Sequence, residues 1–378
     1  MEKQDKIVWI LGAGFSRPLG GPLLNNLFTP VSWELTAGRY PGAPFQVVTP
    51  ASRATHWLYN FGRRFANGRL RDWPAENSGA ELWSDAEQFL ETIDSAVGSD
   101  AAWYVGRAHE YLSHVYASQA IPMPGIEQLS AAGRRLLAAE CCGFLPHLRK
   151  DSEPIRPFRR WLSSTLAKED AIITFNYDRA VEQIAAWYGG AVQQVNPFSP
   201  VRDGTNTPLF KLHGSVDWRR EPSSDAIGPT DEVEFALKCS DEELAIASPG
   251  PNKLNLSAQL RRLWQVAMKE VCSADAIVIV GYRLPHGDAF AREQLLEALQ
   301  QNKQPHLKVR VVLGPNIADP FSVRLLELLK QAMQSAGRQK GTSRVAHTSY
   351  LLTVHTLFGQ DFLERWNRKS ILFALDQE

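Results

Sequence analysis

Two polar residues that each follow a short apolar run are of types suited to moving a proton beside a sugar or a water molecule. Asn176, in the run Thr174-Phe-Asn-Tyr-Asp178, can hydrogen-bond a ribose or hold a water. His213, in the run Lys211-Leu-His-Gly-Ser215, can act as a general base near neutral pH. A lone histidine is more often structural than catalytic, but the position of His213 at the end of a predicted strand favours a functional role.

Asp178 has two interpretations that the sequence leaves open. It directly precedes a stretch of helical composition that runs to Tyr188, so its carboxylate can cap the start of that helix. It also stands beside Asn176 at the end of a predicted strand, where ligands bind in open α/β sheets. We therefore carry Asp178 as a candidate catalytic residue together with Asn176 and His213.

A glycine-rich loop follows the first apolar run, Ile7–Leu11. Its residues are Gly12, Ala13, Gly14, Phe15 and Ser16. Glycines at this point let backbone amides approach a pyrophosphate, and the start of a following helix favours negative charge. The full dinucleotide fingerprint has a third glycine, where this chain has Arg17 and Pro18. The five loop residues are predicted to contact a cofactor, with a plain tight turn as the alternative.

Two more loops of the same kind occur later in the chain. The loop Gly281–Asp288 follows the run Ala276–Val280, and Gly314-Pro-Asn316 follows the run Val309–Leu313. Within the first, Arg283, His286 and Asp288 can line a pocket or form a lid, although a plain turn is nearly as consistent with so many prolines and glycines. Asn316 can contact an adenosine ribose. Outside the glycine-rich loop, the predicted binding residues are Thr174, Gly214, Gly281, Tyr282 and Asn316.

Alternating strands and helices must position these loops. Apolar runs predict buried strands at 7–11, 171–175, 209–212, 276–280 and 309–313, with helices at 178–188 and 256–271. A helix is also expected at 22–35, and loops with one short strand at 219–255. This pattern predicts an α/β fold with a Rossmann-like, mostly parallel, doubly wound sheet formed by residues 1–50 and 167–378. Residues 51–166 show helical spacing and predict a large helical insertion module.

Composition excludes several classes of protein. The chain has 378 residues, 44% of them hydrophobic, and equal numbers (41 each) of basic and acidic residues, which argues against direct nucleic-acid binding and membrane attachment. The apolar run near the start is too short for a signal peptide, so the expected compartment is the cytoplasm. Four cysteines without any C-x-x-C pair predict no zinc module, and no metal is expected.

Taken in order, these motifs resemble the bacterial sirtuin-like family found in anti-phage defence proteins. That family opens with G-A-G-F-S, here Gly12–Ser16. Its T-x-N-Y-D and L-H-G-S stretches match Thr174–Asp178 and Leu212–Ser215. Its G-Y-S-L-P…D stretch matches Gly281–Pro285 with Asp288, except that Arg283 replaces the serine. The acidic segment Glu87–Asp94 also resembles a helix of the family's helical insert.

The resemblance implies an NAD hydrolase that cleaves the nicotinamide–ribose bond to nicotinamide and ADP-ribose, with NAD as substrate. In such an enzyme Asn176 orients the ribose or a water, His213 is the general base, and the glycine loop holds the pyrophosphate. The resemblance further implies a homo-oligomer that depletes NAD in anti-phage defence, with a helicase-type ATPase or an Argonaute-like protein as a partner.

Departures from the deacylating sirtuins favour water as the acceptor. Those enzymes follow the first loop with G-I-P-D-F-R, whereas this chain has Gly20-Gly-Pro-Leu-Leu-Asn-Asn26, and they carry a zinc module held by two cysteine pairs. Two other functions stay open from the sequence. One is a module that binds NAD or ADP-ribose without turnover, and the other is an assembly subunit of a multi-protein defence complex.

Overall fold

The computed structural model describes residues 5–23, 90, 126–200, 204–224, 226–232, 235–240, 242–247, 256, 259–285, 287–340 and 349–373. The chain divides into two compact units. The first contains residues 1–20, 148–213 and 259–378, and the second contains residues 21–147 and 214–258. The predicted insertion at 51–166 falls largely outside the described residues, so its limits stay a prediction, while its described part from Leu148 onward belongs to the first unit.

The first unit is built on an eight-stranded sheet in which every pairing is parallel. The strand order is β10-β11-β9-β8-β1-β2-β4-β3. The strands are β1 (Ile7–Leu11), β2 (Ala171–Thr174), β3 (Val192–Gln194), β4 (Thr207–Lys211), β8 (Ala276–Val280), β9 (His306–Val312), β10 (Gln339–Lys340) and β11 (Ser349–His355). The central strands are continuous apolar runs because both faces of a parallel sheet are covered.

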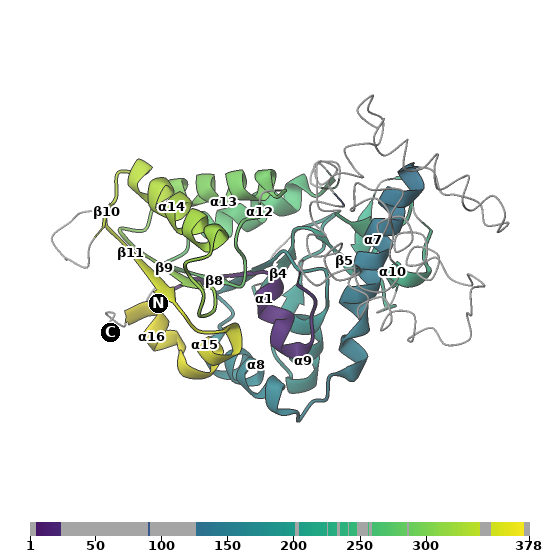
Figure 1. The fold of residues 1–378 in the computed structure, drawn as a ribbon, viewed down its shortest axis with the longest axis horizontal. Helices are drawn as coiled ribbons and strands as arrows, with labels where there is room; N and C mark the ends of the chain where they lie inside the picture. Colours follow the sequence, from purple (N-terminus) through teal and green to yellow (C-terminus); the bar gives the residue numbers. More distant parts are fainter. Residues whose placement is uncertain are drawn as a thin grey trace, which may run out of the picture. The chain divides into compact units, whose positions relative to one another are not determined.

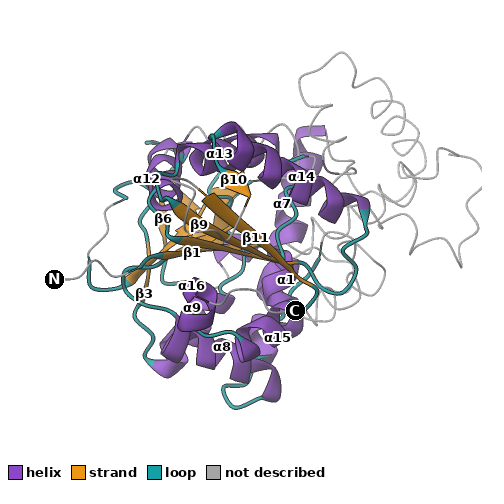
Figure 2. Cartoon of the chain, turned by 90° about the vertical axis from the view of Figure 1, so that its left-hand side faces the viewer, coloured by secondary structure: helices purple, strands orange, loops and turns teal. Residues whose placement is uncertain are grey.

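Helices cover the two faces of this sheet (Figures 1 and 2). One face carries α12 (Arg261–Cys272), α13 (Ala289–Gln301) and α14 (Pro320–Ser335), which pack in sequence order. The other carries α1 (Ala13–Ser16), α8 (Arg156–Arg160), α9 (Ala180–Tyr188), α15 (Gly359–Arg365) and α16 (Arg368–Phe373). The predicted doubly wound, Rossmann-like α/β fold is therefore confirmed.

The order of the strands fixes where a ligand can bind. From β1 the chain passes to β2 and β4 on one side, then crosses to β8, β9 and β11 on the other. The direction of winding thus reverses between β1 and β8, and in open α/β sheets ligands bind at the carboxyl ends of the strands at such a switch point. The loops after β1, β2, β4 and β8 are those that the motifs singled out.

The second unit contains a small antiparallel sheet and two described helices. Its strands pair in the order β6-β5-β7, namely β5 (Gly214–Arg220), β6 (Ile227–Pro229) and β7 (Leu244–Ile246). The helices are α7 (Ile126–Gly143) and α10 (Phe235–Lys238), which contact each other and β5. The expectation of loops with one short strand over residues 219–255 was wrong, because short strands bounded by prolines and charged residues gave little periodicity.

Other predicted elements have mixed outcomes. The strand bounds predicted at 7–11 and 276–280 are confirmed, and the helix predicted at 256–271 begins as α12 at Arg261. Spacing missed β11 and β3, which lie near the sheet's edges. The predicted helix at 22–35 and most of the segment Glu87–Asp94 lie outside the described residues. Across the described ranges, no helix combines the length and apolarity needed to cross a membrane.

Candidate functional site

Strand register brings the motif loops to one level at the carboxyl edge of the sheet. The last residue of β1, Leu11, pairs with Thr174 of β2 and with Val280 of β8. Thr174 in turn pairs with Lys211 of β4. Asn176 and His213 therefore each stand two residues beyond a paired strand end, on neighbouring strands. Residues from two separate motifs thus lie at the carboxyl ends of neighbouring strands.

Asn176 is anchored to the glycine-rich loop through its side-chain nitrogen. Its Nδ2 donates hydrogen bonds to the Gly12 carbonyl at 3.0 Å and to Ser16 Oγ at 3.4 Å. Its own backbone amide donates to Thr174 Oγ1 at 3.1 Å. In the described part of the chain no group donates to the Asn176 side-chain oxygen, and the residue is only partly buried. The amide is thereby oriented with an acceptor left for a ligand.

Asp178 binds the first amide of the helix that follows it, although the residue at the N-cap position is Arg179. Its Oδ1 accepts a hydrogen bond from the Ala180 amide at 2.9 Å, at the start of α9. Burial raises the pKa of Asp178, and the Lys211 charge, the Ala180 amide and the Ser16 hydroxyl partly offset that rise. These contacts support the capping interpretation, and the catalytic role stays a prediction.

Lys211 ties the Asn176 loop to β4. Its side chain is buried, and Nζ donates to the Asp178 carbonyl and to Glu182 Oε1, the latter at 3.1 Å. A buried ammonium is tolerated only when it is paired and hydrogen-bonded. The sequence motif contained Lys211, but nothing in its local pattern indicated that it joins β4 to the loop before α9 and to α9 itself.

His213 is held by a carboxylate from another loop. Its Nε2 lies 3.2 Å from Asp288 Oδ1, and both side chains are buried. The Tyr282 hydroxyl donates to the other oxygen, Asp288 Oδ2, at 2.5 Å. The Phe175 ring stacks on the Tyr282 ring at 4.0 Å between centroids and meets the His213 ring edge-on at 4.9 Å. Asp288 was predicted only as a pocket or lid residue, because its partners lie far away in the sequence.

The glycine loops pack directly on each other. A Cβ placed on Gly14 would stand 2.7 Å from Gly281 Cα, and one on Gly12 would stand 2.6 Å from the Gly281 oxygen. Gly281 has a positive φ of 65°. The Gly12 and Gly14 amides donate to the carbonyls of Val280 and Gly281, at 3.0 and 3.2 Å. These glycines therefore have a packing role, and their amides already have partners within the protein.

The remaining predicted residues lie in different surroundings. Phe15 is a core residue whose ring packs on Phe158 and Trp161. Ala13 begins α1, and its carbonyl accepts from Ser16 Oγ. Gly214 has φ of 85° and begins β5 of the second unit. Asn316 is exposed in the loop before α14.

Arg283 and His286 were also predicted to line a pocket or form a lid. Arg283 donates to the Leu313 carbonyl at 3.0 Å and lies 3.8 Å from Asp319. It therefore joins the loop after β8 to the start of α14. His286 lies outside the described residues. Among those described, no group of three or more His, Cys, Asp or Glu is placed to hold a metal ion.

Fold and site together define an open α/β sheet of the Rossmann-like class with an amide and a carboxylate-paired histidine at the carboxyl ends of neighbouring strands. Residues 170–331 match the family model described as a SIR2-like domain. The predicted sirtuin-like resemblance is thus confirmed for the segment that carries Asn176, His213 and Gly281. The anti-phage subtype stays a prediction.

Two further comparisons add little to this. A solved structure of Sir2 in complex with the inhibitor EX-527, 2'-O-acetyl-ADP-ribose and deacetylated p53 peptide is similar at 12% identity, covers 88% of this chain and 94% of that chain, and has a TM-score of 0.28. A likeness at this level describes neither the site nor the substrate of this chain. The comparison with curated proteins finds no match.

Proposed function

We propose that this chain is an NAD hydrolase that releases nicotinamide and ADP-ribose. The observation that carries the proposal is the pairing of Thr174 with Lys211, which sets Asn176 and His213 side by side at the strand ends. The SIR2-like match over residues 170–331, which contains both side chains, supports it.

The chemistry of the bond suits these two residues. The nicotinamide of NAD is cationic, so it leaves as a neutral base with the electron pair of the C–N bond. Positive charge grows on the ribose C1' carbon, and a water oxygen forms the new bond to it. His213 accepts the proton that this water loses and passes it to solvent. The Asn176 oxygen orients the water or a ribose hydroxyl, so that the reaction needs directed dipoles and one base.

The first test follows NAD turnover by the purified chain, with nicotinamide and ADP-ribose separated by chromatography. We expect Asn176→Ala and His213→Ala each to lower kcat by about 100-fold or more. Matched controls are Asn196→Ala and His306→Ala, two exposed residues outside the site motifs, which should leave the rate unchanged.

Three other outcomes would contradict the proposal. Nicotinamide release that requires an acyl-lysine peptide would indicate a deacylase. NAD binding by calorimetry without turnover would indicate a binding module. Full activity in both site variants would place the chemistry elsewhere in the chain.

A defence role and self-association extend the proposal on the basis of the motif resemblance. We expect light scattering to give a mass above that of one chain, and a strict monomer would count against self-association. We expect bacteria that carry the wild-type gene to lose NAD on phage infection, and those that carry His213→Ala to retain it.

A further inference from the structure

Asp288 stands at a position where an aspartate ordinarily caps a helix, yet it does not do so. It is the residue before α13, and its side chain makes no capping hydrogen bond. Asp319, the residue before α14 in the same unit, shows the usual behaviour, because its side chain accepts from the Phe321 and Ser322 amides. The Asp288 carboxylate therefore does not bind the amides at the start of α13.

Two of its contacts are with donors of the site, one from the loop after β4 and one from its own loop after β8. Oδ1 lies 3.2 Å from His213 Nε2, and Oδ2 accepts from the Tyr282 hydroxyl at 2.5 Å. Asp288 is 2% exposed and His213 is 5% exposed. A carboxylate that is buried between two donors, one at each oxygen, has little freedom to turn away from either.

The surrounding rings hold these contacts in place. Phe175 stacks on Tyr282 with an interplanar angle of 8° and meets the His213 ring edge-on. Between Tyr282 and Asp288 the backbone adopts a positive φ of 50° at Leu284, a conformation that costs energy for a residue with a branched side chain. The Leu284 carbonyl accepts from Arg324 at 2.9 Å, which fixes the loop in that conformation.

We propose that Asp288 is a positioning residue that sets which nitrogen of His213 works as the base. A neutral imidazole carries one proton, and a carboxylate beside Nε2 keeps that proton on Nε2. The lone pair is then on Nδ1, and Nδ1 is the atom that accepts the proton from water. Tyr282 fixes the carboxylate through its second oxygen. The inference rests on the proposed hydrolase for its kinetic consequence but not for the tautomer itself.

The tautomer is measurable without any activity. Long-range ¹H–¹⁵N correlation spectra of the ¹⁵N-labelled chain distinguish a protonated from an unprotonated ring nitrogen, and His213→Gln identifies the His213 signals among those of the nine histidines. We expect wild-type His213, in its neutral form, to carry its proton on Nε2. In Asp288→Asn the Tyr282 hydroxyl still donates its hydrogen bond to the side-chain oxygen, so the new NH₂ group faces His213 Nε2. Because an NH₂ group donates, Nε2 then becomes the acceptor and the ring proton moves to Nδ1. A wild-type proton on Nδ1, or an unchanged tautomer in Asp288→Asn, would overturn the inference.

Kinetics supply the second readout. We expect Asp288→Asn to lower kcat by about 100-fold or more, with KM for NAD changed less than about threefold, because the substitution misplaces a proton without removing a substrate contact. Tyr282→Phe should lower kcat by about three- to tenfold, since the carboxylate keeps its charge but loses one hydrogen bond. Asp151→Asn, on an exposed residue, is the matched control and should change neither constant.

The two readouts separate the two proposals. If the wild type does not hydrolyse NAD, the proposed function fails while the tautomer result still decides the role of Asp288. If the wild type is active and Asp288→Asn retains its kcat with a folded circular-dichroism spectrum, the positioning role is refuted and the hydrolase stands.

Discussion

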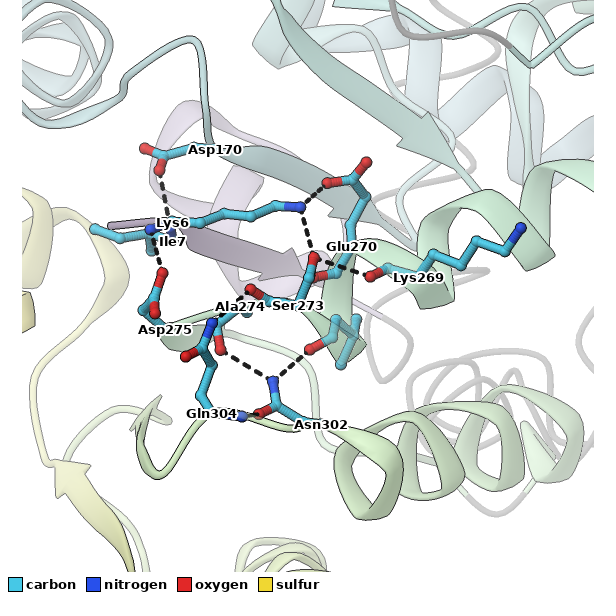
Figure 3. A network of polar contacts seen from close by, with 11 residues as sticks. Lys6, Ile7, Asp170, Lys269, Glu270, Ser273, Ala274, Asp275, Asn302 and Gln304 are labelled. Carbon is cyan, nitrogen blue, oxygen red and sulfur yellow. Dashed lines mark hydrogen bonds and ion pairs between the residues drawn. The ribbon is translucent and has the colours of Figure 1, made fainter. Parts of the chain in front are cut away.

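Aspartates lie at both edges of the parallel sheet, but they make different kinds of contact at the amino edge and at the carboxyl edge. At the amino edge, Asp170 precedes β2 and Asp275 precedes β8, and each accepts a backbone amide from the start of β1 at 2.8 Å, that of Ile7 and that of Lys6 (Figure 3). At the carboxyl edge, Asp288 holds the side chain of His213. Aspartates at one edge join strands, whereas this one orients a side chain.

Polar side chains at the amino edge bind other groups of the protein. Lys6 Nζ contacts Glu270 and the Ser273 hydroxyl, and Asn302 Nδ2 donates to the Val271 and Ala274 carbonyls (Figure 3). The carboxyl edge instead leaves the Asn176 side-chain oxygen without a donor in the described part of the chain. The comparison teaches that polar residues at the amino edge join strands to one another, while the carboxyl edge keeps an acceptor at Asn176 for the proposed ligand. Substitutions at the two edges should therefore separate stability from turnover.

The largest expected effect on stability is at the amino edge. Arg368 donates to Asp170 Oδ2 at 2.6 Å, and Asp170 is fully buried. Arg368→Met leaves a buried carboxylate unpaired and should lower the free energy of unfolding by about 3 kcal/mol, as measured by urea denaturation. NAD turnover per folded molecule should not change. Arg365→Met, on an exposed arginine nearby in the chain, is the control, and an equal loss there would contradict the assignment.

The same variant should show a pH dependence with a definite sign. Burial raises the pKa of Asp170 above its ordinary value of 3.8, and Arg368 lowers it. Without Arg368 the pKa rises further, so the protonated carboxyl is favoured in the folded state. The stability of Arg368→Met relative to wild type should therefore be best below pH 3.8 and decline as the pH rises through the folded-state pKa. A deficit that grows on acidification would contradict this.

An intermediate effect is expected at Lys211, which belongs to the carboxyl edge but also joins β4 to the start of α9. Lys211→Met leaves Glu182 and the Asp178 carbonyl without their buried donor, at a cost of about 2 kcal/mol. It also frees the loop that carries Asn176, so kcat should fall by about tenfold. A loss of stability with unchanged kcat would show that the two edges differ less than we infer.

The smallest effect is expected at Lys6. Its ion pair with Glu270 is partly exposed, with side-chain exposures of 16% and 11%. Lys6→Met should cost about 1 kcal/mol in the free energy of unfolding and nothing in turnover. Lys168→Met, at an exposed pair with Glu169, should cost less than about 0.5 kcal/mol. An equal loss of unfolding free energy in Lys6→Met and Lys168→Met would show that the contacts of Lys6 at the amino edge stabilise no more than an ordinary surface ion pair.

The sequence predicted those elements that depend on the pattern of neighbouring residues. Continuous apolar runs predict β1 and β8 because a buried parallel strand needs no alternation, and Asn176 and His213 stand directly after such runs. The small sheet of the second unit was missed because Ile227–Pro229 and Leu244–Ile246 have three residues each, too few for a periodic pattern. The contact of Asp288 with His213 was missed because the loop around Asp288 predicts only a pocket, a lid or a plain turn, and only the fold brings His213 to it.

The contact between Gly14 and Gly281 has a consequence for how this motif diverges. Neither position has room for a Cβ, whether or not a nucleotide ever binds there. A selection for folding alone would therefore retain both glycines. The two glycines therefore report on the scaffold, and a test of the proposed chemistry has to be made at Asn176 and His213 instead.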